Sequence, residues 1–478
     1  MFMRMIYDES LAQAAYLIGC QRTGEAIVFD PERDVDRYID LARENGLRIV
    51  ATAETHIHAD FVSGSRELAE RIGATVYVSA EGGPDWSYEW LDKKAGGGTY
   101  DHHLLSDGDT FSIGNIDFTV VHTPGHTPEH ICFLVTDRGG GADEPIGMIT
   151  GDFIFVGDLG RPDLLETAAG QAGQMEPSAR QLYETTKRLQ SIPDHVQVWP
   201  AHGAGSACGK SLGAVPISTI GYERKFNAAL RAAHEEQGFV DFILSGQPEP
   251  PLYFKNMKRD NKIGPPVLGG LPLPPKMTVG ELREVDGHRV AVVDTRPWDA
   301  FRAGHVPGAL SLPLGRSFNT DAGSLVQDVD DIVLVCRSED VEPAVRELIR
   351  IGLDRIMGWY DASDLDAYED ATHSLVEVPE VSVEDASRLL DQNDVQVLDV
   401  RRATEFEGGH LPRAINIAHT RLASRMDEVP KDRRLLVNCR SGARSARACS
   451  YLQREGRLVM NLRGGILAWD QATAAVER

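Results

Sequence analysis

The stretch T-H-I-H-A-D-F-V-S-G, residues 55–64, decides how the first half of the chain is interpreted. It follows the apolar run RIVATAE, which is typical of a buried strand. Two histidines one residue apart and an aspartate two further on, His56, His58 and Asp60, are typical metal ligands. The next position, where a second metal ion would want a histidine, is Phe61. The stretch therefore predicts a metal site with one ligand replaced by an apolar ring.

Three later stretches carry further candidate ligands: T-P-G-H-T with His126, T-G-D with Asp152 and P-A-H-G with His202. Each follows an apolar strand, so it is expected in a loop at the end of that strand. Loops at the ends of neighbouring strands lie close together in a sheet, so side chains from distant parts of the sequence can bind one ion there. A single histidine is more often structural, whereas four such stretches in this order indicate a metal site.

Residues 1–245 alternate short apolar runs with turns and a few helical patterns, and residues 246–276 are rich in Pro and Gly. That composition predicts a linker that wraps around the domains or separates them, rather than a segment that packs in a core. The first region contains six predicted strands and two predicted helices. The strands are AIVFD, RIVATAE, TVYVSA, IDFTVVH, ICFLVT and GMITGD, and the helices are SGSRELAERIG and EPSARQLYETTKRLQSI.

Beyond the linker the chain repeats itself. DTRPWDAFRAGHVPGALSL begins at Asp294 and DVRRATEFEGGHLPRAINI begins at Asp399, 105 positions later. In each copy an apolar strand then leads to Cys-Arg-Ser, at Cys336 and at Cys439. This period is too long for a solenoid repeat. It predicts two homologous domains, 277–372 and 378–478, each with a parallel α/β sheet.

The loop C-R-S-G-A-R-S, Cys439 to Ser445, leaves a strand and enters a helical pattern. Such a loop points backbone N–H groups at the sulfur, and the helix dipole together with Arg440 and Arg444 favours the thiolate. A persulfide on Cys439 would lie in the same cradle, and an anionic acceptor such as sulfite would meet the arginines. The competing interpretation is a Cys-dependent phosphatase. Those loops place the arginine one position later than Arg444 stands, so the shorter loop suits sulfur better than phosphate.

The corresponding loop of the first copy is C-R-S-E-D-V-E from Cys336. It lacks counterparts of Gly442 and Arg444, and its acidic residues would raise the pKa of the thiol and repel sulfite. We expect domain 277–372 to be a degenerate copy with a scaffolding role.

The composition sets wider limits. The chain has 478 residues, a hydrophobic fraction of 42% and a formal net charge of −23. These values suit a multidomain globular protein and argue against nonspecific binding to nucleic acid or anionic membranes. No apolar run reaches the length of a membrane span, and the N-terminus lacks a signal-peptide core. The six cysteines show no disulfide spacing. A cytoplasmic location is therefore expected.

The metal-ligand stretches resemble the metallo-β-lactamase fold family over residues 1–245, which implies an αββα sandwich. Members such as glyoxalase II hold two metal ions with an H-x-H-x-D-H motif. Phe61 replaces the last histidine of that motif here, which argues for one ion. Two histidines and a carboxylate around one ion are the arrangement of non-haem Fe(II) oxygenases. The branch of the family with that chemistry is the persulfide dioxygenases. Carried over by motif, its ligands for one Fe(II) per chain are His56, His126 and Asp152, with His58, Asp60 and His202 bonding to neighbouring groups or water.

The same resemblance suggests three residues near the substrate. Arg161, in G-R-P-D, would bind a substrate carboxylate or pair with Asp163. Arg224, in E-R-K-F-N, would meet anionic parts of the substrate or belong to a solvated charged face. Cys208, six residues after His202, would overlook the pocket or be a buried spectator thiol.

The C-terminal copy is similar to rhodanese sulfurtransferase domains. Its matching elements are D-V-R from Asp399, G-H-L-P-R-A from Gly409 and G-G-I-L-A-W from Gly464. Together the resemblances imply an α/β multidomain persulfide dioxygenase–rhodanese fusion. Its substrates would be O₂ and a persulfide of glutathione, coenzyme A or another thiol carrier, and Cys439 would pass sulfane sulfur to sulfite. Related proteins suggest a homo-oligomer. Two alternatives stay open: a zinc-dependent, glyoxalase II-like thioester hydrolase fused to a sulfurtransferase, and a sulfur-carrying scaffold with a vestigial first domain.

Overall fold

The computed structural model describes residues 1–167, 173–327 and 330–472, so the last residues of the predicted domain 378–478 lie outside the described part. The chain divides into two units. Unit 1 comprises Met1–Leu271 with Ile349–Gly352, and unit 2 comprises Pro272–Leu348 and the residues from Leu353 onward. Each unit is described by itself.

Two six-stranded sheets form the frame of unit 1, in the orders β1-β2-β3-β4-β5-β6 and β12-β11-β10-β9-β8-β7. In the first sheet β1 to β3 are antiparallel and β3 to β6 are parallel, and in the second only β10 and β11 are parallel. The strands of the first sheet are β1 Phe2–Asp8, β2 Gln13–Cys20, β3 Glu25–Phe29, β4 Arg48–Ala53, β5 Thr75–Ser79 and β6 His102–Leu105. Those of the second are β7 Thr110–Ile113, β8 Ile116–His122, β9 Ile131–Asp137, β10 Gly147–Gly151, β11 Gln197–Pro200 and β12 Ser218–Thr219.

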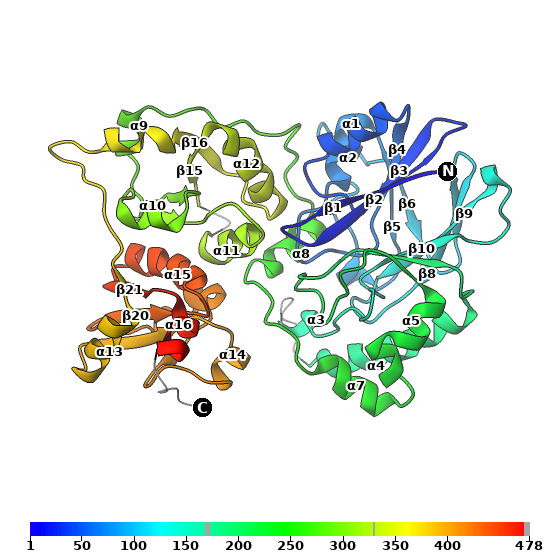
Figure 1. Ribbon diagram of the computed structural model, residues 1–478. Helices are drawn as coiled ribbons and strands as arrows, with labels where there is room; N and C mark the ends of the chain where they lie inside the picture. Colours follow the sequence, from blue (N-terminus) through cyan, green and yellow to red (C-terminus); the bar gives the residue numbers. More distant parts are fainter. Residues whose placement is uncertain (168–172, 328–329, 473–478) are drawn as a thin grey trace. The chain divides into compact units, whose positions relative to one another are not determined.

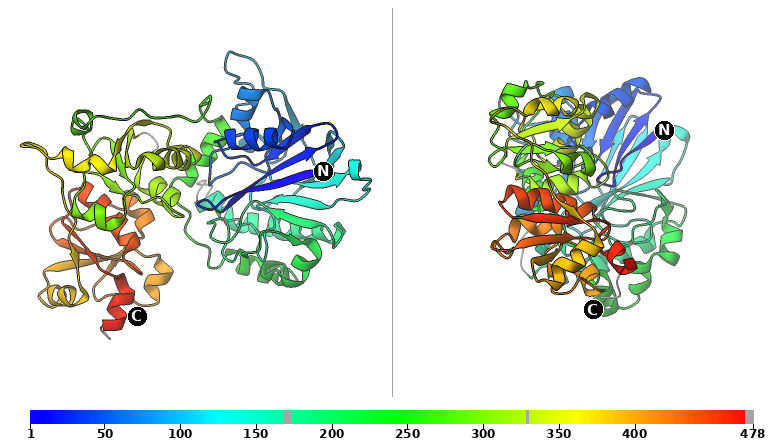
Figure 2. Two further views of the ribbon diagram at one scale, coloured as in Figure 1. Left: turned by 45° about the horizontal axis from the view of Figure 1, so that its top comes forward. Right: turned by 60° about the vertical axis from the view of Figure 1, so that its left-hand side comes forward.

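The two sheets pack face to face, with helices on their outer faces (Figure 1; Figure 2). Strand β2 shows the reason, because its side chains alternate between the two faces of the sheet. Tyr16 and Ile18 face Phe118 and Phe133 of the other sheet, whereas Leu17 packs under α1 and α2. The predicted αββα sandwich is therefore confirmed. The helices of this unit are α1 Asp36–Glu44, α2 Ser65–Ile72, α3 Leu164–Thr167, α4 Met175–Thr186, α5 Ile220–Phe226, α6 Ala228–Ala232, α7 Glu236–Leu244 and α8 Phe254–Ile263.

Helix α8 lies within the segment 246–276, where the sequence predicted a linker that does not pack, and this expectation was wrong for the helix. Its buried face carries Phe254, Met257 and Asn261. The side-chain amide of Asn261 donates to the carbonyls of His58 and Phe61, at 2.8 and 2.7 Å. Its oxygen accepts from the backbone N–H of Ser63 at 2.8 Å. A buried side chain with these partners fixes the backbone of the loop that carries His58 and Phe61. The α8 helix is thus part of the frame that supports this loop.

Unit 2 contains two parallel sheets, in the orders β14-β13-β15-β16 and β17-β21-β20-β18-β19, as predicted for the two copies. The first copy consists of β13 Ala291–Asp294, β14 Leu310–Ser311, β15 Ile332–Cys336, β16 Ile356–Asp361, α9 Val279–Arg283, α10 Trp298–Ala303, α11 Phe318–Leu325 and α12 Val341–Arg350. The second consists of β17 Glu380–Val381, β18 Val395–Asp399, β19 Ile415–Asn416, β20 Arg434–Asn438, β21 Val459–Leu462, α13 Val383–Asp391, α14 Ala403–Glu407, α15 Ala443–Arg454 and α16 Gly465–Ala472.

The repeated residues make the same contacts in both copies. Arg296 pairs with Asp294 and donates to the carbonyl of Gly304 at 2.8 Å. Arg401 pairs with Asp399 in the same way and donates to the carbonyl of Gly409 at 2.7 Å. In each copy the histidine that follows this glycine stacks on a phenylalanine, with ring centroids 3.9 and 3.7 Å apart. These residues are structural braces, which confirms the register of the repeat.

Among the described residues, no helix has both the length and the apolar character that crossing a membrane requires.

Candidate active sites

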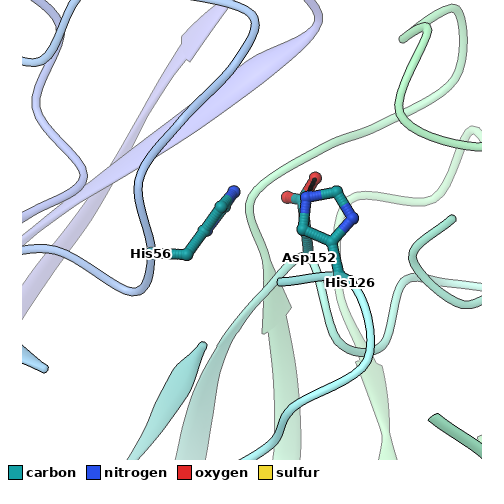
Figure 3. Close-up of side chains that lie close together, drawn as sticks. All are labelled: His56, His126 and Asp152. Atoms are coloured by element: carbon teal, nitrogen blue, oxygen red, sulfur yellow. Dashed lines mark ion pairs between the residues drawn. The ribbon is translucent and has the colours of Figure 1, made fainter. Parts of the chain in front are cut away.

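The predicted metal ligands meet at one edge of the sandwich. His56 lies in the loop after β4, His126 in the loop after β8 and Asp152 in the loop after β10. One ligand atom from each lies within 4.8 Å of the others, and all three side chains are buried. Figure 3 shows His56 pointing from the first sheet toward His126 and Asp152 of the second. Loops from both sheets therefore converge on one point, as the sequence predicted.

The hydrogen bonds of Thr55 fix the tautomer of His56. The Thr55 hydroxyl lies 2.9 Å from Oδ2 of Asp30 and 2.9 Å from Nδ1 of His56. Thr55 has one proton to donate, and the carboxylate of Asp30 can only accept. The hydroxyl therefore accepts from Nδ1–H of His56, which leaves the lone pair on Nε2. Burial and the neighbouring imidazoles hold the pKa of His56 well below its usual range, which favours this neutral form.

Two other imidazoles are oriented in the same manner. Nδ1 of His126 lies 2.9 Å from the carbonyl of Arg161, and Nδ1 of His202 lies 3.0 Å from the carbonyl of Ala12. A carbonyl only accepts, so each Nδ1 carries the proton and each Nε2 is left for a ligand. Burial lowers the pKa of His126, so its ring also favours the neutral form.

The carboxylate of Asp152 lies between these imidazoles. Oδ2 is 3.4 Å from Nε2 of His126, and Oδ1 is 3.4 Å from Nε2 of His202. Neither oxygen of this buried carboxylate has a hydrogen-bond partner among the described residues. Buried polar atoms are rarely left without partners, and two lone pairs facing a carboxylate repel it unless a cation lies between them. The residues His56, His126 and Asp152 therefore fit a divalent metal ion.

His58, the second histidine of the motif, turns away from this point. Its Nε2 lies 3.1 Å from Oδ1 of Asp30 and 3.1 Å from Oε2 of Glu54. Although burial lowers the pKa of His58, the two carboxylates raise it well above its usual range, so the charged ring balances buried acid. Phe61 is fully buried and packs on His58 with ring centroids 4.3 Å apart. The apolar ring thus completes a structural cluster beside the candidate metal ligands.

Asp60 and Cys208 form a second group of buried polar side chains with His202. Oδ2 of Asp60 is 3.2 Å from Nε2 of His202, and one ligand atom each from Asp60, His202 and Cys208 lie within 4.8 Å of one another. The thiol of Cys208 is buried and lies beside Asp60 and His202. Burial and then the charges of Asp60 and Asp152 raise the pKa of Cys208 well above its usual range. These neighbours therefore hold the Cys208 thiol in its protonated form.

The two arginines proposed near the substrate have protein partners. Arg161 is 1% exposed and forms two hydrogen bonds with Asp163, at 2.8 and 2.5 Å, while a third reaches the carbonyl of Ala207 at 2.9 Å. Arg224 pairs with Asp194 and donates to the carbonyls of Leu189 and Ile192. Arg161 braces loops beside the site, whereas the partners of Arg224 precede β11, at the end of that strand opposite to His202, so in this structure neither arginine reaches out to a ligand.

Sequence reasoning missed Asp30 and His130. Asp30 accepts from Thr55 N–H at 2.7 Å as well as from its hydroxyl, and so sets the geometry behind His56. Nε2 of His130 accepts from the backbone N–H of Asp152 at 3.0 Å, and its Nδ1 lies 2.7 Å from the hydroxyl of Thr123. The available signals were an acid that ends the run AIVFD, and a histidine four positions after His126.

The second site is the Cys439 loop of unit 2. Sγ of Cys439 accepts from the N–H of Gly442 at 3.2 Å and from the hydroxyl of Ser445 at 3.4 Å. Gly442 has a φ of 98°, which a residue with a side chain adopts only under strain. A side chain at Gly465 would meet the carbonyl oxygen of Cys439 at 2.3 Å. The G-G-I-L-A-W element thus packs directly against the loop, which presents donors to the sulfur as predicted.

The two arginines of this loop differ in their surroundings. Arg444 forms two hydrogen bonds with the carboxylate of Glu405, at 2.7 and 2.8 Å. These bonds lower the pKa of Glu405 to about 2. Arg440 is exposed. Of the two predicted anion-binding residues, Arg440 faces solvent, whereas Arg444 is already paired with the carboxylate of Glu405.

The Cys336 loop of the first copy lacks these features. Arg337 pairs with Asp340 and Glu339, at 2.8 and 3.0 Å, at the surface. Burial, followed by the charges of Asp340 and Asp361, raises the pKa of Cys336 to about 12. A thiol that stays protonated is a poor nucleophile. The structure therefore agrees with a degenerate first copy.

Comparison with known proteins gives a family for each part of the chain. The family model of the metallo-beta-lactamase superfamily matches residues 10–202, and that of the rhodanese-like domain matches residues 280–367 and 382–472. A crystal structure of a metallo-beta-lactamase from Staphylococcus aureus subsp. aureus COL is 40% identical and superposes with a TM-score of 0.66. It covers 75% of this chain, and this chain covers 98% of it.

Two curated proteins are each similar to part of the chain. A sulfurtransferase of Allochromatium vinosum is 46% identical over 94 residues, which are 19% of this chain and 88% of that protein. The mitochondrial persulfide dioxygenase ETHE1 of Bos taurus is 26% identical over 238 residues, 49% of this chain and 78% of that protein.

Proposed function

This chain belongs to the metallo-β-lactamase superfamily and carries two rhodanese-like domains, and on that premise we propose that it oxidises low-molecular-weight persulfides and transfers sulfur to the product. The first reaction is RSSH + O₂ + H₂O → RSH + SO₃²⁻ + 2 H⁺. The second moves sulfane sulfur from another persulfide through Cys439 to sulfite and yields thiosulfate. Such a pair of reactions would remove sulfide-derived persulfides, so sulfide detoxification is the role we propose.

His56, His126 and Asp152 would hold one Fe(II), which when bound supplies the redox chemistry that joins O₂ to sulfane sulfur. The tautomers fixed by Thr55 and by the carbonyl of Arg161 would leave the Nε2 lone pairs of His56 and His126 free to bind the ion. His130 holds the backbone of Asp152 in place. All three ligands are buried, which limits the access of bulk water to the reacting groups.

In the second site the Cys439 thiolate would attack the sulfane sulfur of RSSH. The Cys439–S bond forms and the RS–S bond breaks, and RS⁻ leaves with the sulfane proton as RSH. The persulfide on Cys439 remains within reach of the Gly442 N–H and the Ser445 hydroxyl, which lie 3.2 and 3.4 Å from Sγ. Sulfite then attacks the outer sulfur and releases thiosulfate and the Cys439 thiolate. This cycle needs no external oxidant or reductant.

The observation that carries the proposal for unit 1 is the buried carboxylate of Asp152, which has no hydrogen-bond partner among the described residues and faces two Nε2 atoms. The test is O₂ uptake with glutathione persulfide, together with the sulfite and thiosulfate formed. His126→Ala should abolish O₂ uptake and leave sulfur transfer from thiosulfate to cyanide unchanged. His195→Ala is the matched control, because that histidine is 55% exposed in its side chain.

Each alternative has its own outcome in this experiment. Bound zinc with hydrolysis of a glutathione thioester and no O₂ uptake would establish the glyoxalase II-like hydrolase instead. A His126→Ala protein indistinguishable from wild type in every assay would establish the sulfur-carrying scaffold with a vestigial first domain.

A further inference from the structure

A cavity of about 590 Å³ lies within unit 2, between the two rhodanese-like domains and beside the Cys439 loop. The active domain contributes Gly442, Arg447 and Arg463 to its walls, and the degenerate domain contributes Trp298, Arg302 and Pro313. Gly442 is the residue whose N–H contacts Sγ of Cys439. The cavity therefore reaches the loop that carries the sulfur, and one of its walls comes from the copy whose own loop has lost the sulfur-binding pattern.

The size of this cavity exceeds what the sulfur-transfer step alone requires. Pockets of about 300–1,000 Å³ enclose ligands of the size of a cofactor fragment or drug. Sulfite and thiosulfate are far smaller and would fill only a small part of it. A persulfide attached to a carrier such as a short peptide or a nucleotide derivative has a body that needs such a space.

Arginine donors on the walls can bind an anionic body. Three arginines and two acids, Asp299 and Glu380, line the cavity, and Arg447 is held by Asp321 and by the carbonyl of Ala443. Arg463 pairs with Glu380 at 2.8 Å, and Glu380 also accepts from Trp298 Nε1 at 2.8 Å. Arg302 pairs through Nε with Asp299, which is 86% exposed, at 3.0 Å, and the charge of Arg302 also helps to lower the pKa of Glu380. Such an exposed pair is weak. In the part of the chain that the structure describes, the two Nη groups of Arg302 stay available for a carboxylate or phosphate.

We infer that this cavity binds the body of an anionic low-molecular-weight thiol carrier while its persulfide sulfur is transferred to Cys439, with Arg302 as a specificity-determining residue. This inference rests on the proposed sulfur transfer at Cys439. The chemistry shared by candidate carriers is a thiol on a flexible body with carboxylate or phosphate groups. The function of the degenerate domain is then to complete the carrier site of its neighbour.

The reaction that the site serves is RSSH + Cys439–S⁻ → RSH + Cys439–S–S⁻. The bond between Cys439 Sγ and the sulfane sulfur replaces the RS–S bond, and the leaving RS⁻ takes the proton. The carrier body stays unchanged, so contacts with Arg302 act on the binding of the donor rather than on the bond exchange.

The test uses the full chain and three sulfur donors, glutathione persulfide, coenzyme A persulfide and thiosulfate, with cyanide as acceptor and thiocyanate as the measured product. Arg302→Ala should raise KM for at least one carrier persulfide about tenfold, the size expected when a hydrogen bond between charged groups is lost. Its kcat and the KM for thiosulfate should change less than about twofold, because thiosulfate does not occupy the carrier site. The donor that is affected distinguishes a peptide carboxylate from a nucleotide phosphate. Arg302→Lys should restore part of the loss.

Arg337→Ala is the matched control, because Arg337 is an exposed arginine of the same domain that pairs with Glu339 and Asp340. Equal effects of Arg302→Ala on all three donors, or no effect on either persulfide, would overturn the inference.

Calorimetric binding of S-methylglutathione and S-methyl-coenzyme A separates this inference from the proposed function. If the wild type transfers no sulfur but binds one of these thioethers, and Arg302→Ala weakens that binding about tenfold, the sulfur-transfer proposal fails and the carrier site stands. Equal binding to both proteins would remove the carrier site whatever the activity.

Discussion

Replacing Thr55 by valine isolates the hydrogen bond that orients His56. Valine has nearly the shape of threonine but no hydroxyl, so Nδ1–H of His56 loses its acceptor and Oδ2 of Asp30 loses a donor at 2.9 Å. Nothing then holds the proton on Nδ1 or the lone pair on Nε2. Groups that orient metal ligands in this way contribute about 10- to 100-fold to metal affinity. That range corresponds to about 1.4–2.7 kcal/mol.

The substitution should also affect folding, because Thr55 is fully buried. A buried donor left without its partner costs about 1–3 kcal/mol of unfolding free energy. Asp30 limits this loss, since it still accepts from the backbone N–H of Thr55 at 2.7 Å. The metal-free protein should therefore unfold at a lower denaturant concentration than wild type but remain folded at room temperature.

The assay is a competitive titration of the metal-loaded protein with a chelator of known affinity, run anaerobically with Fe(II). Thr186→Val is the control, because that buried hydroxyl donates to the carbonyl of Tyr183 in α4, outside the metal-ligand loops. We expect a 10- to 100-fold weaker Kd for Thr55→Val and wild-type affinity for Thr186→Val. If Thr55→Val binds the metal as tightly as wild type while its stability falls, the hydroxyl supports the fold only and the tautomer argument is refuted.

Three further predictions concern unit 2. Cys439→Ser should abolish thiocyanate formation and leave O₂ uptake intact, whereas Cys336→Ser should change neither, and a persulfide found on Cys336 during turnover would contradict the degenerate assignment. Because the pKa of Cys336 is about 12, its alkylation by iodoacetamide in the folded protein should rise about tenfold per pH unit from pH 7 to 11, and a plateau near pH 8 would be inconsistent with that pKa. Glu405, with a pKa of about 2 beside Arg444 against an ordinary value of 4.5, stabilises the fold fully above pH 4.5 and loses that effect as the pH falls through about 2. The Tm difference between wild type and Glu405→Gln should therefore shrink between pH 5 and pH 2, and a constant difference would contradict the pairing.

The sequence predicted those parts of the fold that local patterns encode. Short apolar runs marked six of the twelve strands described in unit 1, and loops that follow three of these six strands carry His56, His126 and Asp152, whereas β1, β2, β6, β7, β11 and β12 were not predicted. The offset between Asp294 and Asp399 marked the two copies, whose arginine and histidine braces agree in detail. Patterns of this kind are set by residues close together in the chain, which is why they can be recognised before any tertiary contact is known.

Other features depend on contacts between distant residues. The prolines and glycines around α8 concealed a helix whose Phe254, Met257 and Asn261 are spaced to share one face. Asp30 lies 25 residues before Thr55 and belongs to no motif, so only the folded chain shows that it sets the tautomer of His56. Arg161 and Arg224 resembled substrate ligands, but whether an arginine is free for a substrate depends on its acidic neighbours in space. The cavity beside Cys439 needs both copies and could not be predicted from either.

We propose that His56, His126 and Asp152 hold one iron that serves persulfide oxidation. The most direct test measures metal content and O₂ consumption on one anaerobically purified sample supplied with glutathione persulfide. We expect one iron per chain and one O₂ consumed for each sulfite formed, with thiosulfate counted as sulfite already converted. One or two zinc ions per chain, with thioester hydrolysis and no O₂ uptake even after reconstitution with iron, would contradict it.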